Sequence, residues 1–276
     1  MTAESEGKDA AERFREEHDL GSQPVGDLVT LIEQTVGADV AVLDTEVDQH
    51  GMTMRRGDGG RVYIAVAKTP HPMRQRSTLA HELGHVVFDD WATHPRVDSR
   101  DPIESRANAF ARHLLVPVEG VRNLVAHQHF GSELSMLSTV VQRFLVSPQL
   151  AAIALEQAGY ISTAAKHEFM NETAPRLAAR FGWSDQYQAM QLESDRRRAP
   201  QRLLARAISG WLQNVVSIQT IALLRGLDIA TVQRELTDAG LAPVAVTPAW
   251  SSGAVPPKVD IDLAALDADL SEDGSQ

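Results

Sequence analysis

The sequence has no cysteine among its 276 residues. Disulfides, thiolate metal sites and cysteine nucleophiles are therefore excluded, and any bound metal must be held by His, Asp or Glu. No run approaches the roughly 18 apolar residues that a membrane-spanning helix needs, and residues 1–11 lack the apolar segment of an export signal. The sequence also lacks a Gly-rich phosphate-binding loop. We therefore expect a cytoplasmic protein with no membrane or nucleotide partner.

Positive charge is also scarce. The formal net charge is −11, and residues 254–276 hold one Lys and six Asp or Glu, so the rest of the chain is only mildly acidic. Non-specific DNA binding depends on Lys and Arg side chains that neutralise phosphates. The charge balance argues against direct DNA binding as the main activity, although a local basic patch could still provide it.

Hydrophobic residues make up 43% of the chain, which is enough for a buried core. Three early runs have strand propensity and predict a small antiparallel sheet. They span residues 39–43, 51–55 and 61–66. Helical periodicity precedes the sheet and follows it almost to the end of the chain. The helical segments are 9–18, 25–36, 75–91, 103–115, 136–144, 148–158 and several between 165 and 239. This order predicts an α+β fold.

Residues 81–85 read His-Glu-Leu-Gly-His. In a helix, positions i and i+4 share one face, so both imidazoles can bind the same ion. Glu82 lies about 100 degrees around the helix axis, where it can reach a metal-bound water and act as a general base. The alternative is a surface helix with incidental histidines. Apolar neighbours such as Leu79 and Leu83 instead predict a buried helix, in which unsatisfied polar groups are costly.

A catalytic zinc site keeps three protein ligands and one open position, so a further ligand is needed. A third histidine shortly after the motif would indicate a metzincin, but Phe88 and Trp91 occupy those places. We predict that Glu104, at the start of the next helix, is the third ligand. Asp101 and Glu119, at the edges of that helix, are the alternatives.

Asn108 lies one turn after Glu104 on the same predicted helix face. Its amide oxygen could accept the free N–H of a ligating imidazole and fix the orientation of the ring. Two histidines and a carboxylate suit one zinc ion, although the same set could hold Fe(II), Mn or Co.

A peptidase would also need a donor to stabilise the oxyanion of the tetrahedral intermediate. The sequence offers several candidates without deciding among them: Tyr63, His71, Arg74, Arg76 and His113. Arg76 could equally have a structural role, and we expect His113 to be a surface residue. The strand at 61–66 could bind a substrate by adding a peptide strand to the sheet edge.

Longer motifs surround these positions. They are Arg76, then Thr-Leu-Ala-His-Glu-Leu-Gly-His at 78–85, Glu-x-x-Ala-Asn-x-Phe-Ala at 104–111 and Leu-Leu-x-Pro at 114–117. Together they resemble ImmA/IrrE-type metallopeptidases over residues 25–120 and more weakly to residue 161. The chain departs from the family pattern at Ser77, at Asp89, where a histidine is frequent, and at Arg106, which is often acidic. None of these departures removes a ligand or the base.

The resemblance implies a zincin-like peptidase fold and a protein substrate. The best understood members cleave helix-turn-helix repressors that control mobile elements or stress genes. We therefore expect a zinc endopeptidase acting on such a repressor; the alternative is a DNA- or protein-binding regulator with a structural zinc site. The predicted division is an N-terminal extension (1–24), the peptidase domain (25–130), a helix-turn-helix-like segment (131–164), a C-terminal helical domain (165–243) and a flexible acidic tail (244–276).

Two segments, 139–159 and 220–240, each resemble a helix-turn-helix. The second is the better match because Gly226 stands at the turn, Val232 at a core position, and Asp228 could cap the second helix. An ordinary antiparallel helix pair has the same geometry. Five arginines lie just upstream of the second segment and predict either a basic face or a simple solvated surface. They are Arg196, Arg197, Arg198, Arg202 and Arg206.

Overall fold

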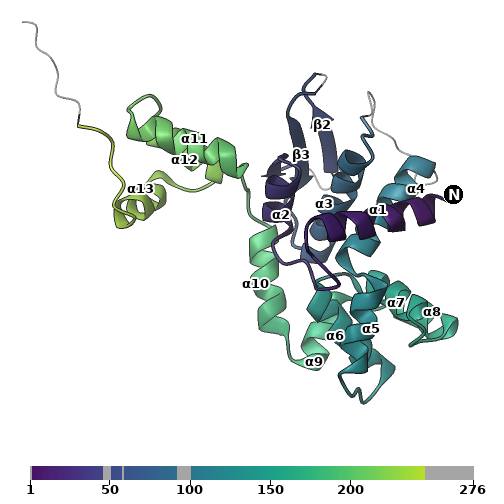
Figure 1. The fold of residues 1–276 in the computed structure, drawn as a ribbon. Helices are drawn as coiled ribbons and strands as arrows, with labels where there is room; N and C mark the ends of the chain where they lie inside the picture. The colour runs from purple at the N-terminus through teal and green to yellow at the C-terminus, as the bar shows by residue number, and fades with distance from the viewer. Residues whose placement is uncertain (1, 46–50, 58, 92–100, 246–276) are drawn as a thin grey trace, which may run out of the picture. The chain divides into compact units, whose positions relative to one another are not determined.

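The computed structural model describes residues 2–45, 51–57, 59–91 and 101–245, and Figure 1 labels their helices and strands. Residues up to Ala242 form one unit, which is described below. Its strands are β1 (Asp39–Leu43), β2 (Gly51–Arg55) and β3 (Val62–Ala67). The helices before and around the sheet are α1 (Ala3–Glu17), α2 (Leu28–Thr35), α3 (Pro72–Val87) and α4 (Pro102–Leu115). The predicted α+β fold is confirmed.

The remaining helices follow in an unbroken series. They are α5 (Val118–Ala126), α6 (Glu133–Phe144), α7 (Pro148–Gln157), α8 (Thr163–Phe169), α9 (Ala174–Phe181), α10 (Ser184–Ser194), α11 (Gln201–Leu212), α12 (Ile218–Arg225) and α13 (Ile229–Asp238). None of the helices in the described part of the chain is long and apolar enough to cross a membrane. The predicted acidic tail lies outside the described residues from 246 onward.

The sheet has the strand order β1-β3-β2 and is mixed. β2 pairs with β3 in antiparallel orientation as predicted, but β1 pairs with β3 in parallel, so the expectation of a purely antiparallel sheet is wrong. Burial explains the arrangement. Ile64 of β3 pairs with the buried Val40 of β1, whereas β2 is largely exposed and takes an edge. β3 is therefore central and cannot accept a peptide strand, contrary to the prediction for residues 61–66.

Helix α4 packs between α1 and α3, and a glycine lies at each crossing. A Cβ on Gly7 of α1 would come within 2.5 Å of both the Ala109 Cβ and the Arg106 carbonyl oxygen. A Cβ on Gly84 of α3 would lie 3.2 Å from the Ala107 Cα. Both glycines thus allow unusually close contact between helix backbones. Gly84 is the fourth residue of the His-Glu-Leu-Gly-His motif, so the motif itself brings α4 near.

Two separate apolar cores are present in the described residues. The larger core is continuous from α1 to α10 and includes fully buried Leu83, Phe110 and Leu155. The smaller core joins α11, α12 and α13 around Trp211 and Ile221. Helix α11 also contacts β1, where Arg202 pairs with Asp39 at 3.0 Å.

The two segments that resemble a helix-turn-helix differ in exposure. In the first, the fully buried residues of α7 include Ala151, Ala154 and Leu155, so this helix is part of the core and cannot enter a DNA groove. In the second, α12 and α13 are joined at Gly226, whose φ is +64°, and Asp228 caps α13 by accepting a 2.8 Å hydrogen bond from the Thr231 N–H. The expected turn glycine and cap at 220–240 are thus present.

Candidate metal centre

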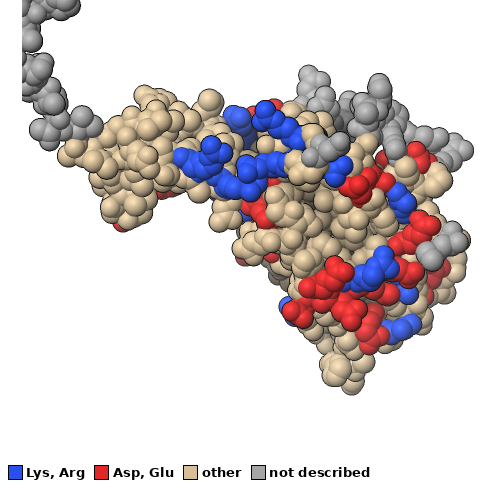
Figure 2. Space-filling view, turned by 45° about the horizontal axis from the view of Figure 1, so that its top comes forward, with Lys and Arg blue, Asp and Glu red and all other residues tan. Residues whose placement is uncertain are grey.

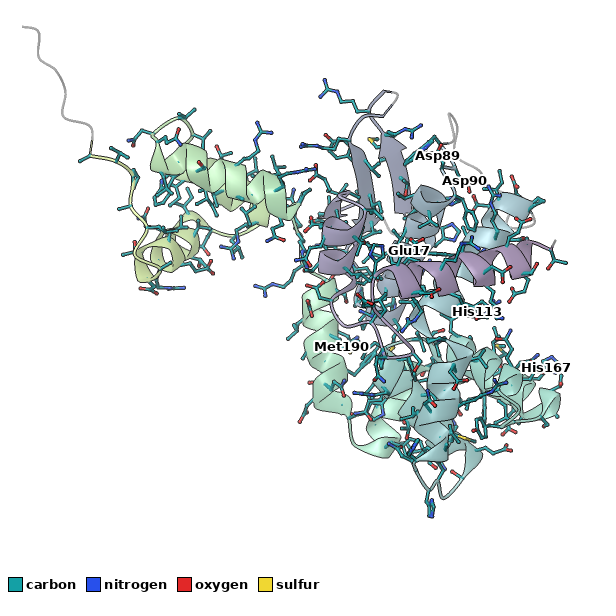
Figure 3. The ribbon with its side chains drawn as sticks, in the orientation of Figure 1. Glu17, Asp89, Asp90, His113, His167 and Met190 are labelled. Carbon is teal, nitrogen blue, oxygen red and sulfur yellow. The ribbon has the colours of Figure 1, made fainter. Side chains whose placement is uncertain are left out.

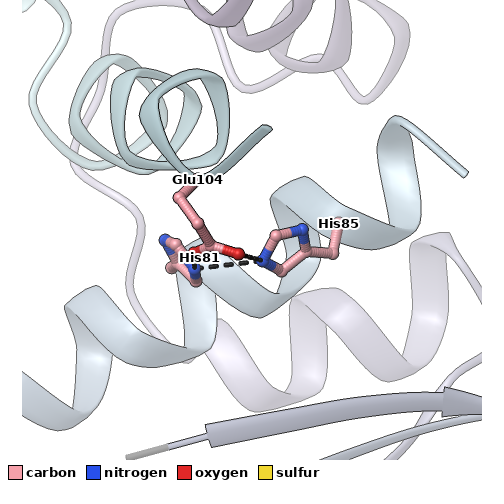
Figure 4. Close-up of side chains that lie close together, drawn as sticks. All are labelled: His81, His85 and Glu104. Atoms are coloured by element: carbon pink, nitrogen blue, oxygen red, sulfur yellow. Dashed lines mark hydrogen bonds and ion pairs between the residues drawn. The ribbon is translucent and has the colours of Figure 1, made fainter. Parts of the chain in front are cut away.

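Helix α3 presents His81 and His85 on one face, one turn apart, as the motif predicts. Their Nε2 atoms lie 3.1 Å from each other. Glu104 reaches the same point from the first turn of α4 (Figure 4): its Oε2 is 3.1 Å from the His81 Nε2, and its Oε1 is 3.6 Å from the His85 Nε2. Three side chains from two helices therefore direct their donor atoms toward one point.

The two alternative carboxylates are engaged elsewhere. Asp101 is the N-cap of α4 and accepts a 2.9 Å hydrogen bond from the Ile103 N–H. Because this cap and Pro102 start the helix just before Glu104, they determine the direction in which Glu104 points. Glu119 lies in α5 and forms an exposed ion pair with Arg122 at 3.8 Å. Among the three predicted carboxylates, only Glu104 lies beside both histidines.

The separations fit the ligands of one small ion. Donor atoms that bind zinc at about 2.0–2.1 Å in a tetrahedral arrangement lie about 3.3 Å apart. The three separations here are 3.1, 3.1 and 3.6 Å. Two imidazole nitrogens facing one another and a carboxylate at such distances are well explained by a shared cation, and this donor set suits zinc among other divalent metals.

Asn108 has the predicted supporting position. Its Oδ1 lies 2.9 Å from the His81 Nδ1, so it can accept that N–H and leave the Nε2 lone pair for a metal. Asn108 lies one turn beyond Glu104 on α4, and the same helix thus supplies both a ligand and the partner of another ligand.

Glu82 points toward the sheet and is only 7% exposed. Its Oε2 accepts a 2.6 Å hydrogen bond from the Thr53 hydroxyl of β2. A Cβ on Gly51 would lie 2.5 Å from the Glu82 Oε1, so glycine at that position leaves room for the carboxylate. Burial raises the pKa of the Glu82 carboxyl above its ordinary value, and the hydrogen bond from Thr53 opposes that rise. Nearby charges act in both directions, since His81 and His85 lower this pKa and Glu104 raises it.

The comparison with protein families agrees with this geometry. Residues 37–156 match the family described as peptidase M78, IrrE N-terminal-like domain. The match identifies residues 37–156, under half of the chain, as an IrrE N-terminal-like domain. The match contains the sheet, the three candidate ligands and Glu82, and it ends in α7. No curated protein matches the chain in a second comparison.

In this IrrE N-terminal-like domain, Arg76 contacts backbone and not the ligand set. Its guanidinium donates to the carbonyl oxygens of Val25 at 2.6 Å, Gly26 at 2.7 Å and Leu145 at 3.2 Å. Burial lowers the pKa of Arg76 to about 10. These contacts favour the structural alternative, in which Arg76 joins α3 to the chain before α2 and to the end of α6.

The other oxyanion candidates also lie apart from the ligands. Tyr63 is paired with Met54, whereas Thr53 is paired with Ile64. Because side chains alternate along a strand, Tyr63 lies on the sheet face opposite to the one that meets Glu82. His71 and Arg74 are exposed and lie before and in the first turn of α3, two to three turns from His81.

The expectation that His113 is a surface residue is wrong. Its side chain is 5% exposed, and its Nε2 lies 3.0 Å from the Glu4 Oε1 of α1. Figure 3 labels it close to α1. Because α1 covers this side of α4, His113 is buried by a helix that precedes it by about a hundred residues, and it contributes to helix packing.

Neither Thr53 nor Gly51 was predicted at the site. Both lie in β2, about thirty residues before Glu82, and only the packing of β2 against α3 brings them near its carboxylate. The available signal was Gly51 itself, because a glycine in a predicted strand, here its first residue, can mark a close approach of other atoms.

Proposed function

We propose that the protein is a zinc-dependent endopeptidase that cleaves a helix-turn-helix transcriptional repressor in the cytoplasm and thereby relieves repression of its target genes. The main support is the grouping of His81, His85 and Glu104 around one point, with the buried Glu82 beside them. Membership of residues 37–156 in a peptidase family supports hydrolysis of peptide bonds. The choice of a repressor as substrate rests on the resemblance of the motifs to ImmA/IrrE-type peptidases.

The residues around the ligands suit a hydrolytic mechanism. A metal ion held there would supply an acidified water and polarise the peptide carbonyl. Glu82 can accept a proton on its carboxylate and return it to the leaving amine. The Thr53 hydroxyl fixes one carboxylate oxygen, and the missing Cβ of Gly51 leaves space for the other. Asn108 holds the His81 ring in one orientation.

The edge strand β2 is the best candidate for substrate binding. One side of β2 pairs with β3, and the other side has no strand partner among the described residues. An extended peptide could add to that side through backbone hydrogen bonds. Because Thr53 of the same strand contacts Glu82, a peptide added there would run near the base. This arrangement favours an extended linker of a repressor as the segment that is cleaved.

The proposal can be tested with the purified full chain, zinc and the repressor encoded by a neighbouring gene. We expect cleavage at one or a few peptide bonds, detected as new termini by mass spectrometry, and no cleavage after removal of zinc with a chelator. A peptidase without selectivity for the repressor would cleave unrelated folded control proteins equally well. If zinc-loaded protein leaves the repressor and all control proteins intact, the proposed function is wrong.

Thr53 offers a second test of the proposed mechanism. Thr53→Val removes the hydroxyl that binds Glu82, and a hydrogen bond to a charged group contributes about 1.5–3 kcal/mol. We expect kcat to fall roughly tenfold or more, while KM and zinc content stay unchanged. Thr53→Ser keeps the hydroxyl and should retain most of the rate. Equal losses in both variants would assign the effect to strand packing and contradict a role of the hydroxyl.

The alternative, a DNA-binding regulator, has weaker support. Figure 2 shows Lys and Arg gathered in a band on the viewed face, and Arg196, Arg197 and Arg206 are exposed. However, the described helix α13, which would read the groove, carries one arginine against Glu235 and Asp238. Such a helix contributes little to phosphate neutralisation. Specific gel shifts by the full chain that survive loss of the zinc ligands would favour this alternative.

A further inference from the structure

At the end of α3 the chain turns back and places Asp90 against His85, the second histidine of the motif. Asp89 has a left-handed backbone with φ +55°, and its N–H donates to the Val86 carbonyl at 3.2 Å. The next N–H, of Asp90, donates to the His85 carbonyl at 2.9 Å. This pair of hydrogen bonds is a Schellman motif, in which the residue after the left-handed position folds over the third-last helical residue. Those two residues usually make an apolar contact, but here they are Asp90 and His85.

The Asp90 carboxylate lies against the His85 ring. Its Oδ2 is 3.6 Å from the His85 Nδ1, and its side chain is only 8% exposed. This oxygen has no hydrogen-bond partner within the described residues at ordinary hydrogen-bond distance. A buried carboxylate oxygen without a partner is costly. A small rotation of the imidazole would bring its Nδ1–H to this oxygen and satisfy both groups.

The two histidines are thus supported in parallel ways. The Nδ1 of His81 faces the Asn108 amide oxygen, and the Nδ1 of His85 faces the Asp90 carboxylate. In each ring the opposite nitrogen, Nε2, faces Glu104. An acceptor at Nδ1 favours the tautomer that carries its proton there and leaves Nε2 free to bind a metal.

Arg106 holds the Asp90 carboxylate in this place. Its Nη2 donates to the Asp90 Oδ1, and its guanidinium lies over the Phe88 ring at 4.6 Å from the ring centre. Its Nη1 is 3.7 Å from the Glu6 Oε2 of α1. The pairing offsets the cost of burying the carboxylate. Figure 3 labels Asp90 next to Asp89, which pairs with Arg55 at 2.9 Å and points to a different partner.

We propose that Asp90 is a positioning residue for the metal ligand His85, and that Arg106 holds Asp90 in that role. The inference rests on the metal site of the proposed function but not on peptide hydrolysis. Arg106 is one of the departures from the family pattern, since it stands where an acidic residue is common. In this chain Arg106 and Asp90 form an ion pair on the Nδ1 side of the His85 ring.

The test measures zinc affinity of the full chain by competition with a chromophoric chelator. Loss of a carboxylate that orients a ligating histidine commonly reduces metal affinity 10- to 100-fold. We expect Asp90→Ala to fall in that range and Asp90→Asn to lose less, because its amide oxygen can still accept the Nδ1–H. Asp89→Asn is the matched control: the same chemical change one residue earlier, in a side chain that does not face His85, should leave the affinity unchanged.

A spectroscopic measurement separates positioning from general stability. Nitrogen chemical shifts of the imidazoles report which ring nitrogen is protonated, and in zinc-free protein we expect the His85 Nδ1–H tautomer to lose population in Asp90→Ala. Arg106→Leu should weaken zinc binding in the same direction. Zinc affinity within twofold of wild type and an unchanged tautomer in folded Asp90→Ala would overturn the proposal. If zinc affinity responds as expected but no protein substrate is cleaved, the proposed peptidase function fails while the role of Asp90 stands.

Discussion

Replacing Glu82 by Gln is expected to reduce peptide hydrolysis at least about a hundredfold while zinc remains bound. A positioned general base contributes roughly 10²- to 10⁴-fold to a hydrolytic rate, and an amide cannot accept the proton. The change is isosteric, and the Thr53 hydroxyl, now 2.6 Å from the Glu82 Oε2, can donate to the amide oxygen instead. The ligands His81, His85 and Glu104 are untouched. The measurements are kcat on the cleaved substrate and zinc content per chain.

The two readouts distinguish the possible outcomes for this variant. Loss of rate with full zinc content identifies Glu82 as the base. Retained cleavage would contradict the mechanism, because the other two carboxylates beside the ligands have different roles in our proposals. Glu104 binds the metal, and Asp90 lies on the Nδ1 side of His85, where it pairs with Arg106. Loss of both rate and zinc would instead assign a metal-binding role to Glu82.

Removal of the third ligand should have the largest effect on metal binding. Glu104→Ala leaves two histidines, and we expect zinc affinity to fall roughly 10³-fold. Structural zinc in peptides contributes about 10–16 kcal/mol in total, so one ligand of three corresponds to about 4 kcal/mol. Because the carboxylate lies 3.1 Å from the His81 Nε2 and 3.6 Å from the His85 Nε2, no nearby group replaces it without movement.

Glu119→Ala is the control for this variant. Glu119 was the alternative ligand from the sequence, and in the structure it is an exposed partner of Arg122 in α5. Its removal should leave zinc affinity unchanged. An affinity of Glu104→Ala close to that of wild type, measured by competition titration, would show that the third ligand lies elsewhere.

The features that could be predicted from the sequence are those set by short-range periodicity. His81 and His85 share a face because they are four residues apart in a helix, and Asn108 follows Glu104 on one face for the same reason. The positions of helix ends are predicted less accurately. The helix expected at 75–91 is Pro72–Val87, since Pro72 starts it earlier and the left-handed Asp89 ends it.

The features that could not be predicted depend on contacts between distant parts of the chain. The strand order of the sheet, the burial of His113 under α1 and the contact of Thr53 with Glu82 all arise when separate elements pack together. A single sequence carries no pattern for such contacts. The same is true of Arg76, whose three carbonyl partners lie about 50 and 70 residues away.

The close packing of α4 between Gly7 and Gly84 determines how much ordering of the chain metal binding would require. At both crossings a backbone atom of α4 lies so near the glycine that a Cβ there would come within 2.5 Å of it at Gly7 and 3.2 Å at Gly84. The distance from α3 to α4, and with it the reach of Glu104 toward the two histidines, is therefore fixed when the protein folds. The ligands are preorganised, so ion capture requires little ordering of the chain. We therefore expect the domain to stay folded when a metal at this site is removed, unlike a zinc finger.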